Sequence, residues 1–548
     1  MPSRAEPHRQ ATGSRGMVVC AHPLAAQAGI RALNDGGNAV DAAVATGMAL
    51  AVVHPSAGNI GGGGFMLVRT ADGTVTSFDF REKAPQAATA ELFLDAAGKL
   101  IPQSNHEGHR AVGVPGTVAG FDLALRRFGK KSWAAGCAAA IDLAEQGFPL
   151  TPAMAAEFAA HSADWLKNAA AKRVFLRPDG SPFPAGAAWK QPELAATLRR
   201  IAAQGAAGFY GGETARLLAA DMAAHGGIMV EADLASYQAK ERPPVRGTYR
   251  GWEVISMGPP SSGGVALIEM LNLLEPDKVG ALPHHSAPHL HLLAEVMRRA
   301  YADRARFLGD PDFNAALPLT KLLSKDHALA LRRSLQPDKA GKSAPADVTE
   351  PGESEETTHF SVVDAAGNAV AVTYTLEYSY GARIVADGLG FLYNNEMGDF
   401  NPQPGRTDAT GLIGTPPNRI SPGKRMLSSM TPTLLVRDGK LRLVTGSPGG
   451  RTIINTVLQV VSNTVDFQMA LPAAVAAGRI HHQWLPDEIR AEPAAMNDAA
   501  RHALQSMGHT VRVGSKQGRV MAIAVDPASG TRTGVADPRD PDAAALAQ

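Results

Sequence analysis

The sequence predicts a mixed fold of helices and β-strands. Some segments, such as 287–308, repeat apolar residues at helical spacing, whereas others are short runs rich in β-branched and aromatic residues that end in turn signals. No low-complexity linker divides the 548 residues, so length alone does not indicate separate domains. This mixture is compatible with two sheets between helical layers, although periodicity does not specify that arrangement.

Helices and strands alternate along the chain. The apolar stretch 40–53 is too short to span a membrane and is expected to form a buried helix. We expect helices at 23–33, 39–52, 123–128, 192–204 and 287–308, and strands at 65–69, 75–80, 359–364, 369–375, 433–437 and 441–446.

The strands at 359–364 and 369–375 are expected to form a hairpin around the turn 365–368. With a four-residue loop, Asp364 pairs with Ala369, and counting back places Thr375 opposite Thr358. A slip of one residue places Thr375 opposite Thr357. In either register, Thr375 lies beside Thr357.

Thr357 is the candidate nucleophile. An internal threonine hydroxyl has no base of its own, but cleavage of the Glu356–Thr357 bond would give Thr357 an α-amine with a pKa of about 7.7–8.0. Nucleophile and general base would then share one residue. The sequence therefore predicts cleavage before Thr357, with the alternative that the two threonines pair only for packing.

Composition indicates small-molecule chemistry. The 53 basic and 52 acidic residues give a formal net charge of +1, which does not point to nucleic acid or an anionic membrane. Cys20 and Cys137 are too few for a disulfide framework and are expected to be packed thiols. The first ten residues lack the apolar core of a secretory signal, so we expect a cytoplasmic protein, or a periplasmic one if the start is truncated.

Two further patterns are weak. His106-Glu107-Gly108-His109 resembles a zinc signature, but its second histidine comes one residue early and Gly108 disfavours a helix. We therefore expect no metal. The glycines at 61–64 lack the residues that complete a phosphate loop and are expected to allow close approach of neighbouring backbone.

Motifs along most of the chain resemble those of gamma-glutamyltransferases, autoprocessing N-terminal-nucleophile enzymes that take a γ-glutamyl group from glutathione and related amides. The resemblance implies a four-layer αββα sandwich, a large fragment 1–356, a small fragment 357–548 and no cofactor. The matching segments are 35–43, 58–66, 79–82, 115–121, 259–264, 301–304, 357–364, 394–400, 427–430, 446–450 and 537–539.

The resemblance also implies a role for each site residue. A glutamyl substrate presents an α-carboxylate, which suits a guanidinium fork, and an α-ammonium, which needs acceptors. The implied roles are Arg81, Ser428 and Ser429 for the carboxylate, Asp399 and Glu396 for the ammonium, Gly449 and Gly450 for the oxyanion, and Thr375 for orienting Thr357.

Two positions depart from the family pattern. Glu377 stands where the family usually has an asparagine, so three carboxylates would surround one ammonium. Either one is protonated, another cation is present, the amine is bound differently, or Glu377 is an alternative acceptor. In the loop 401–423, Thr410 stands where some bacterial members have an aromatic gate, which would favour hydrolysis over transfer.

The sequence therefore predicts a γ-glutamyltransferase and hydrolase that uses water or an amine as acceptor. One alternative is a cephalosporin or glutaryl amide acylase of the same fold, although Arg81 and Asp399 favour a substrate with an α-amino acid group. A second alternative is a binding protein that never matures. Pairing of mature heterodimers into a larger assembly is left open.

Overall fold

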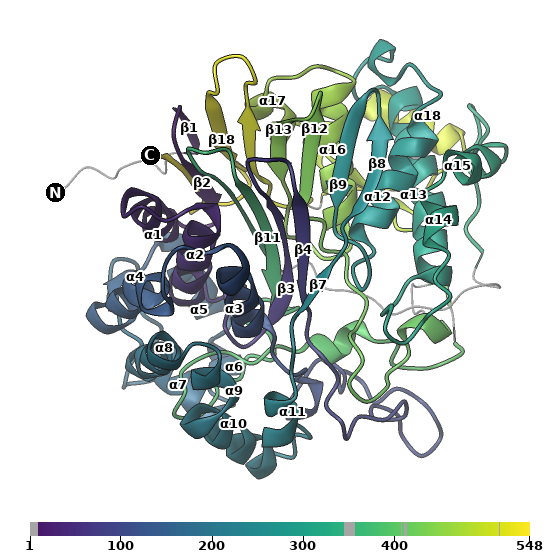
Figure 1. Cartoon of the computed structure of the whole chain (residues 1–548). Coiled ribbons are helices and arrows are strands. Elements are labelled where there is room, and N and C mark those ends of the chain that lie inside the picture. The colour runs from purple at the N-terminus through teal and green to yellow at the C-terminus, as the bar shows by residue number, and fades with distance from the viewer. Residues whose placement is uncertain (1–8, 345–356, 407, 410–413, 515) are drawn as a thin grey trace.

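The computed structural model describes residues 9–344, 357–406, 408–409, 414–514 and 516–548. Two sheets lie face to face in the centre of the molecule, and helices cover both outer faces (Figure 1). The predicted αββα sandwich is therefore confirmed. Glu356 and Thr410, two positions singled out in the sequence, lie outside the described residues.

Each central sheet has seven strands, and neighbouring strands within each are antiparallel. The first sheet has the order β1 (Gln10–Gly13), β18 (Arg532–Ala536), β17 (Met521–Val525), β13 (Lys440–Thr445), β12 (Thr433–Arg437), β9 (Trp252–Ser256) and β8 (Val245–Tyr249). The second sheet has the order β19 (Ala544–Ala547), β2 (Met17–Cys20), β10 (Thr358–Val363), β11 (Ala369–Thr375), β3 (Gly63–Arg69), β4 (Val75–Phe80) and β7 (Lys240–Arg242).

Different helices cover the two sheets (Figure 1). On the side of the second sheet lie α1 (Pro23–Asn34), α2 (Ala39–Val53), α3 (Thr117–Phe128), α4 (Trp133–Gln146) and α8 (Pro192–Gln204). On the side of the first sheet lie α12 (Gly263–Leu274), α13 (Ala287–Phe307) and α16 (Thr452–Val465).

Smaller elements complete the described part of the chain. The helices are α5 (Pro152–Ala160), α6 (Ser162–Trp165), α7 (Ala169–Phe175), α9 (Ala207–Tyr210), α10 (Gly212–Ala224), α11 (Glu231–Ala235), α14 (Leu319–Leu322), α15 (Lys325–Arg332), α17 (Leu471–Ala476) and α18 (Asp498–Ser506). The short strands are β5 (Phe148–Pro149), β6 (Ala188–Trp189), β14 (Ile480–His481), β15 (Ile489–Ala491) and β16 (Val511–Val513). The 3-10 turns are η1 (His109–Ala111), η2 (Val279–Ala281), η4 (Glu396–Asp399), η5 (Pro416–Asn418) and η6 (Pro493–Ala495).

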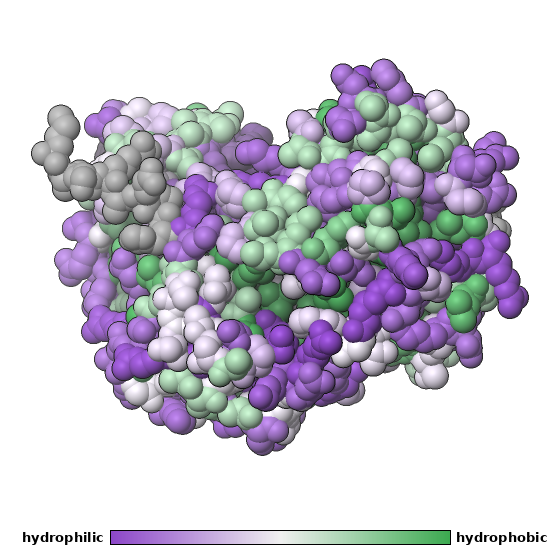
Figure 2. Space-filling model, turned by 90° about the horizontal axis from the view of Figure 1, so that it is seen from above, coloured by the Kyte–Doolittle hydropathy of each residue, from purple (hydrophilic) through white to green (hydrophobic). Residues whose placement is uncertain are grey.

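Helix α2 is buried along its whole length, as its composition predicts. Across the described ranges, no helix is both long enough and apolar enough to cross a membrane. Cys20 and Cys137 are free and buried, so their prediction as packed thiols is confirmed. On the face seen in Figure 2, the more hydrophobic residues gather toward the middle and hydrophilic residues toward the edges.

Helix α3 begins six residues before the expected position 123, at Thr117. Gly120 lowers the helix propensity of this first part. A side chain at Gly120 would overlap the Phe80 ring, so this glycine lets α3 lie directly against β4. Packing therefore outweighs local propensity here.

Candidate active site

The hairpin of β10 and β11 places Thr357 opposite Thr375. Thr358 pairs with Tyr374, and Val363 pairs with Ala369, so continuing the ladder by one residue brings the two threonines together. The slipped register is therefore correct, and pairing of Thr375 with Thr358 is wrong. The reason lies in the turn, where Asp364 accepts the Asn368 N–H on its side chain at 2.9 Å and the loop shortens to three residues.

The two threonines are in contact. Thr357 Oγ1 donates to Thr375 Oγ1 at 3.4 Å, and the backbone N–H of Glu377 donates to the same Thr375 oxygen at 2.8 Å. Both threonines are buried. The Glu377 amide thus holds the hydroxyl that lies against the candidate nucleophile.

Alternation along β10 turns Thr357, His359 and Ser361 toward the first sheet. His359 hydrogen-bonds Thr373 Oγ1 at 2.8 Å and Ser361 Oγ at 3.1 Å, and Ser361 Oγ donates to the Met521 carbonyl at 2.9 Å. Burial lowers the pKa of His359 to about 3, so the ring is neutral. This polar row between the sheets orients the strand that begins at the nucleophile.

Gly449 and Gly450 lie between β13 and α16, and both have positive φ, 130° and 52°. A Cβ on Gly449 would lie 2.5 Å from Thr452 Oγ1, so a side chain is excluded by space as well as by conformation. Gly450 lines the same pocket as Thr357. Two successive glycines at the start of a helix can direct backbone N–H groups into one cavity.

Arg81 follows β4 and is fully buried. Its guanidinium pairs with Glu396 at 2.6 Å and with Asp399, and it donates to the Leu427 carbonyl at 3.1 Å. The Tyr237 hydroxyl donates to the Arg81 carbonyl at 2.8 Å, which holds the backbone. The residues predicted to bind the two charged groups of one amino acid are therefore in direct contact.

Glu82 is a member of this cluster that sequence reasoning did not assign. Its carboxylate lies 3.4 Å from Arg81 Nη1 and is fully buried. Burial raises the pKa of Glu82 to about 8, although Arg81 opposes that rise. Burial likewise raises the pKa of Glu396 well above its ordinary value. Burial thus favours the neutral forms of both acids and opposes the repulsion among the carboxyls that surround the Arg81 cation.

Glu377 lines the pocket and faces His106, with His106 Nδ1 3.1 Å from a Glu377 carboxylate oxygen. The His106 ring stacks on Tyr378 at 4.6 Å between centroids. Burial lowers the pKa of His106 to about 4, despite the nearby carboxylate of Asp399. Glu377 has a φ of 79°, which is unusual for a residue other than glycine and typical of functional sites.

Ser428 and Ser429 form the opposite wall of the pocket. Arg304, from α13, donates to Ser429 Oγ at 3.0 Å and to Ser262 Oγ at 2.8 Å, and the Ser262 hydroxyl donates to the Ser428 carbonyl. From sequence, no role is assigned to Arg304, which lies within the matching segment 301–304. No signal within 301–304 shows that the side chain reaches a serine 125 residues later.

These groups share one open pocket between the two sheets and the segments that follow them. Among the predicted residues, Gly449 is the one described residue that does not line it, although it precedes Gly450. The lining consists of Arg81, Thr357, Thr375, Glu377, Glu396, Asp399, Ser428, Ser429, Met430, Gly450 and Ile453.

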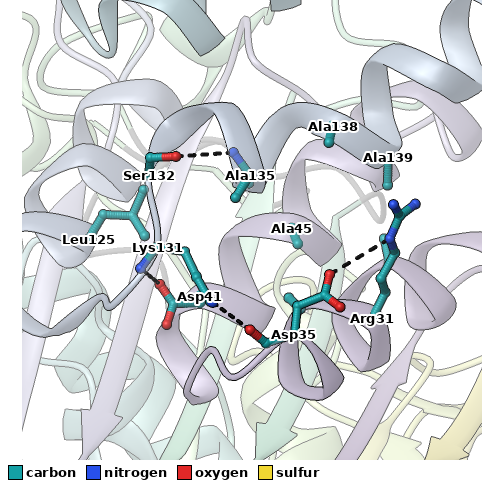
Figure 3. A pocket seen from close by; sticks show the side chains of 13 residues that line it. Arg31, Asp35, Asp41, Ala45, Leu125, Lys131, Ser132, Ala135, Ala138 and Ala139 are labelled. Carbon is teal, nitrogen blue, oxygen red and sulfur yellow. Dashed lines mark hydrogen bonds and ion pairs between the residues drawn. The ribbon is translucent and has the colours of Figure 1, made fainter.

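A separate cavity of about 140 Å³ lies between α1, α2 and α4 (Figure 3). Much of its wall is alanine, and its charged members include Arg31 and Asp35, which pair with each other. It has no nucleophile with a positioned base.

Residues 25–547 match the family model described as Gamma-glutamyltranspeptidase. A glutathione hydrolase proenzyme from a Pseudomonas species is 45% identical over 511 residues, which cover 93% of this chain and 89% of that protein. A glutathione hydrolase proenzyme from Escherichia coli is 44% identical over 531 residues, covering 96% and 91%.

The fold has a solved counterpart in cephalosporin acylase from Bacillus halodurans. Its TM-score is 0.86 at 28% sequence identity, and the match covers 100% of this chain and 98% of that one. The two glutathione hydrolases and this acylase thus differ in the amide that their names imply.

Proposed function

The chain belongs to the gamma-glutamyltranspeptidase family, and we propose that it is an autoprocessing enzyme that cleaves γ-glutamyl amides such as glutathione. The glutamyl group passes to water or to an amine. The observation that carries this proposal is the contact of 3.4 Å between Thr357 and Thr375 within a pocket that also contains Arg81 and Asp399.

Maturation is the first reaction. Thr357 Oγ attacks the carbonyl carbon of Glu356, the peptide C–N bond breaks, and the chain is joined through an ester. Water then hydrolyses the ester, which leaves a carboxylate on Glu356 and an α-amine on Thr357. The fragments are 1–356 and 357–548, and the word proenzyme in the names of the relatives supports this step.

The mature Thr357 then acts on substrate. Its amine accepts the hydroxyl proton while Oγ bonds to the γ-carbonyl carbon, and the backbone N–H groups of Gly449 and Gly450 bind the oxyanion. The amine passes the proton to the leaving nitrogen as the amide C–N bond breaks. Water or an acceptor amine attacks the resulting ester and restores the hydroxyl.

Binding of the glutamyl head rearranges the charges around Arg81. The substrate carboxylate takes the guanidinium fork and the hydroxyls of Ser428 and Ser429, while Asp399, Glu396 and Glu377 accept from the ammonium. Arg81 makes internal ion pairs with Glu396 and Asp399. A substrate that carries both charges takes over these pairs, because its carboxylate binds Arg81 and its ammonium binds the two acids. Recognition is then an exchange of ion pairs that keeps buried charges compensated.

Maturation is tested by purifying wild type and Thr357→Ala and measuring fragment masses under denaturing conditions. We expect two wild-type fragments, one beginning at Thr357, and an intact variant. A wild-type chain that stays whole would contradict the proposal and favour a binding protein.

The acylase alternative is supported by the Bacillus halodurans structure. Two anilide substrates distinguish an acylase from a γ-glutamyl enzyme. These substrates, γ-glutamyl anilide and glutaryl anilide, differ only in the α-amino group. We expect kcat/KM to favour the glutamyl compound by about 100-fold or more, because glutaryl leaves Asp399 without an ammonium partner. Asp399→Asn should reduce turnover of the glutamyl compound and leave glutaryl turnover nearly unchanged. Preference for glutaryl anilide would establish the acylase instead.

A further inference from the structure

Three side chains outside the pocket form a cluster with metal-ligand chemistry. His109 lies in η1, Asp221 lies in α10, and His225 follows the end of that helix. One ligand atom from each residue lies within 4.8 Å of the other two. The structure thus turns His106 toward Glu377 but brings His109 to partners more than 100 residues away in sequence.

His109 has a buried nitrogen that needs a partner. Its side chain is 7% exposed, and its Nε2 makes no hydrogen bond with the described residues. The carboxylate of Asp221 lies 3.7 Å from this nitrogen, too far for a hydrogen bond. Buried polar groups without partners are rare, and one of the accepted explanations is an ion at the site.

The other two ligands are held in place, and one of them is open to solvent. Asp221 and His225 are four residues apart, so they share one side of the end of α10. His225 Nδ1 lies 3.0 Å from Asp221 Oδ1, and the His225 side chain is 51% exposed. The Tyr393 hydroxyl donates to Asp221 Oδ2 at 2.8 Å and fixes the carboxylate as an outer partner.

We propose that His109, Asp221 and His225 bind one zinc-type divalent transition metal ion, with solvent as the fourth ligand. Imidazole and carboxylate donors suit Zn²⁺ and its neighbours in the first transition row, whereas Mg²⁺ and Ca²⁺ prefer oxygen ligands alone. Zinc would draw the ligand atoms to about 2.0–2.2 Å from itself. The His225 ring stacks on His109, and its Nδ1 lies 2.9 Å from the Asp221 carbonyl oxygen. Metal binding would require this ring to turn, and its exposure of 51% leaves room for that movement.

Two other clusters offer similar donors but are already occupied by protein partners. In the cluster of His291, Glu295 and His509, Arg298 and Arg299 pair with the glutamate, and their charges oppose a cation. In the cluster of Glu269, Asp303 and His327, the histidine already binds the aspartate at 2.5 Å.

The metal would connect segments that carry the pocket. Tyr393 directly precedes Asn394, which accepts the N–H groups of Gly113 and Glu396 on its side-chain oxygen. An ion at His109 and Asp221 would therefore brace the same run of chain that presents Glu396 and Asp399. This proposal does not rest on the reaction assigned to Thr357.

The test uses chelator-treated full-length protein titrated with Zn²⁺ in a calorimeter and with Co²⁺ in a visible-absorption experiment. His225→Asn and His109→Asn remove one ligand each, and His502→Asn is the control because His502 is an exposed histidine elsewhere on the surface. Circular dichroism establishes that each variant is folded.

We expect wild type and His502→Asn to bind one equivalent of Zn²⁺ and to give the intense visible bands of tetrahedral Co²⁺. His225→Asn and His109→Asn should bind at least tenfold more weakly and lose those bands. Equal binding by wild type and His225→Asn, or no binding by wild type, would overturn the proposal. His225→Asn is the decisive variant because its exposed side chain is not needed for the core.

Discussion

At the scale of single residues, the Thr375 hydroxyl is fixed next to the nucleophile. Its oxygen receives the Glu377 N–H at 2.8 Å and lies 3.4 Å from Thr357 Oγ1, so it restrains the rotamer of the nucleophile. We expect Thr375→Ala to slow both maturation and turnover by roughly 10- to 100-fold, because a misplaced reacting group loses about that factor. Fragment yield over time and steady-state kcat measure the two effects.

The control for Thr375→Ala is Thr358→Ala. Thr358 is equally buried, but alternation along β10 turns its side chain to the opposite face of the sheet. This variant should mature and turn over at close to the wild-type rate. Equal losses of maturation and turnover in the two variants would show that both substitutions act only by disturbing the packing of the hairpin.

Glu82 makes the stability of the folded protein depend on pH in a predictable direction. Its pKa rises from 4.5 in the unfolded chain to about 8 in the folded protein, so the folded state holds the proton more tightly. The stability that Glu82 contributes is full below pH 4.5 and is lost as pH rises toward 8. We expect Glu82→Gln to reduce this pH-dependent loss of unfolding free energy by a few kcal/mol.

The measurement is urea denaturation between pH 5 and 8 in the Thr357→Ala background, which keeps the chain uncut. Glu91→Gln is the control, because the Glu91 side chain is 67% exposed. The fall in unfolding free energy should be smaller in Glu82→Gln than in both the parent and Glu91→Gln. Parallel pH profiles for the three proteins would contradict the assignment.

Resemblance to the family identified most lining residues of the pocket, and each of them suits a group of a glutamyl substrate. Sequence reasoning did not identify Glu82, His106 or Arg304, whose roles arise only when distant segments meet. It also left two hairpin registers open, because the choice depends on whether Asp364 caps a turn of three residues. Side-chain capping of this kind is a local contact that spacing alone does not reveal.

At the scale of elements, boundaries were predictable where propensity and packing agree. Helix α8 and strands β11 and β12 have the expected bounds. The glycines at 61–64 also act as predicted, since a side chain on Gly62 would overlap the Thr375 carbonyl. Helix α3 was predicted six residues too short, because Gly120 lowers the helix propensity of its first part. The glycine is present because it allows close contact with Phe80.

Helix α13 delivers Arg304 to the serine wall of the pocket. One guanidinium reaches both Ser262 and Ser429, a fork that a single ammonium cannot reproduce. We expect Arg304→Lys to raise KM for γ-glutamyl anilide by about tenfold while kcat changes by less than about threefold, since carboxylate binding weakens before chemistry does. Steady-state kinetics over substrate concentration separates the two constants.

Arg306→Lys is the control within the same helix, because Arg306 is exposed. It should leave both constants near wild type. A fall in kcat with unchanged KM in Arg304→Lys would show that the arginine acts on the reacting groups rather than on substrate binding.

At the scale of the whole molecule, the two proposed fragments are interleaved. In the first sheet, strands β18 and β12 of 357–548 pair with β1 and β9 of 1–356. In the second sheet, β2 lies between β19 and β10, and β11 pairs with β3. Neither fragment has a complete sheet of its own, so cleavage at Thr357 should not release them.

This interleaving predicts that the cut protein behaves as one folding unit made of two chains. Under native conditions, both fragments should elute together with the mass of one chain, 57.2 kDa, or a multiple of it. Because unfolding then separates two molecules, the urea midpoint of mature wild type should rise with protein concentration. Uncut Thr357→Ala has the same contacts in one chain, so its midpoint should not depend on concentration unless full chains also associate. Fragments that separate in urea while circular dichroism remains native would show that each half folds independently, contrary to the shared sheets.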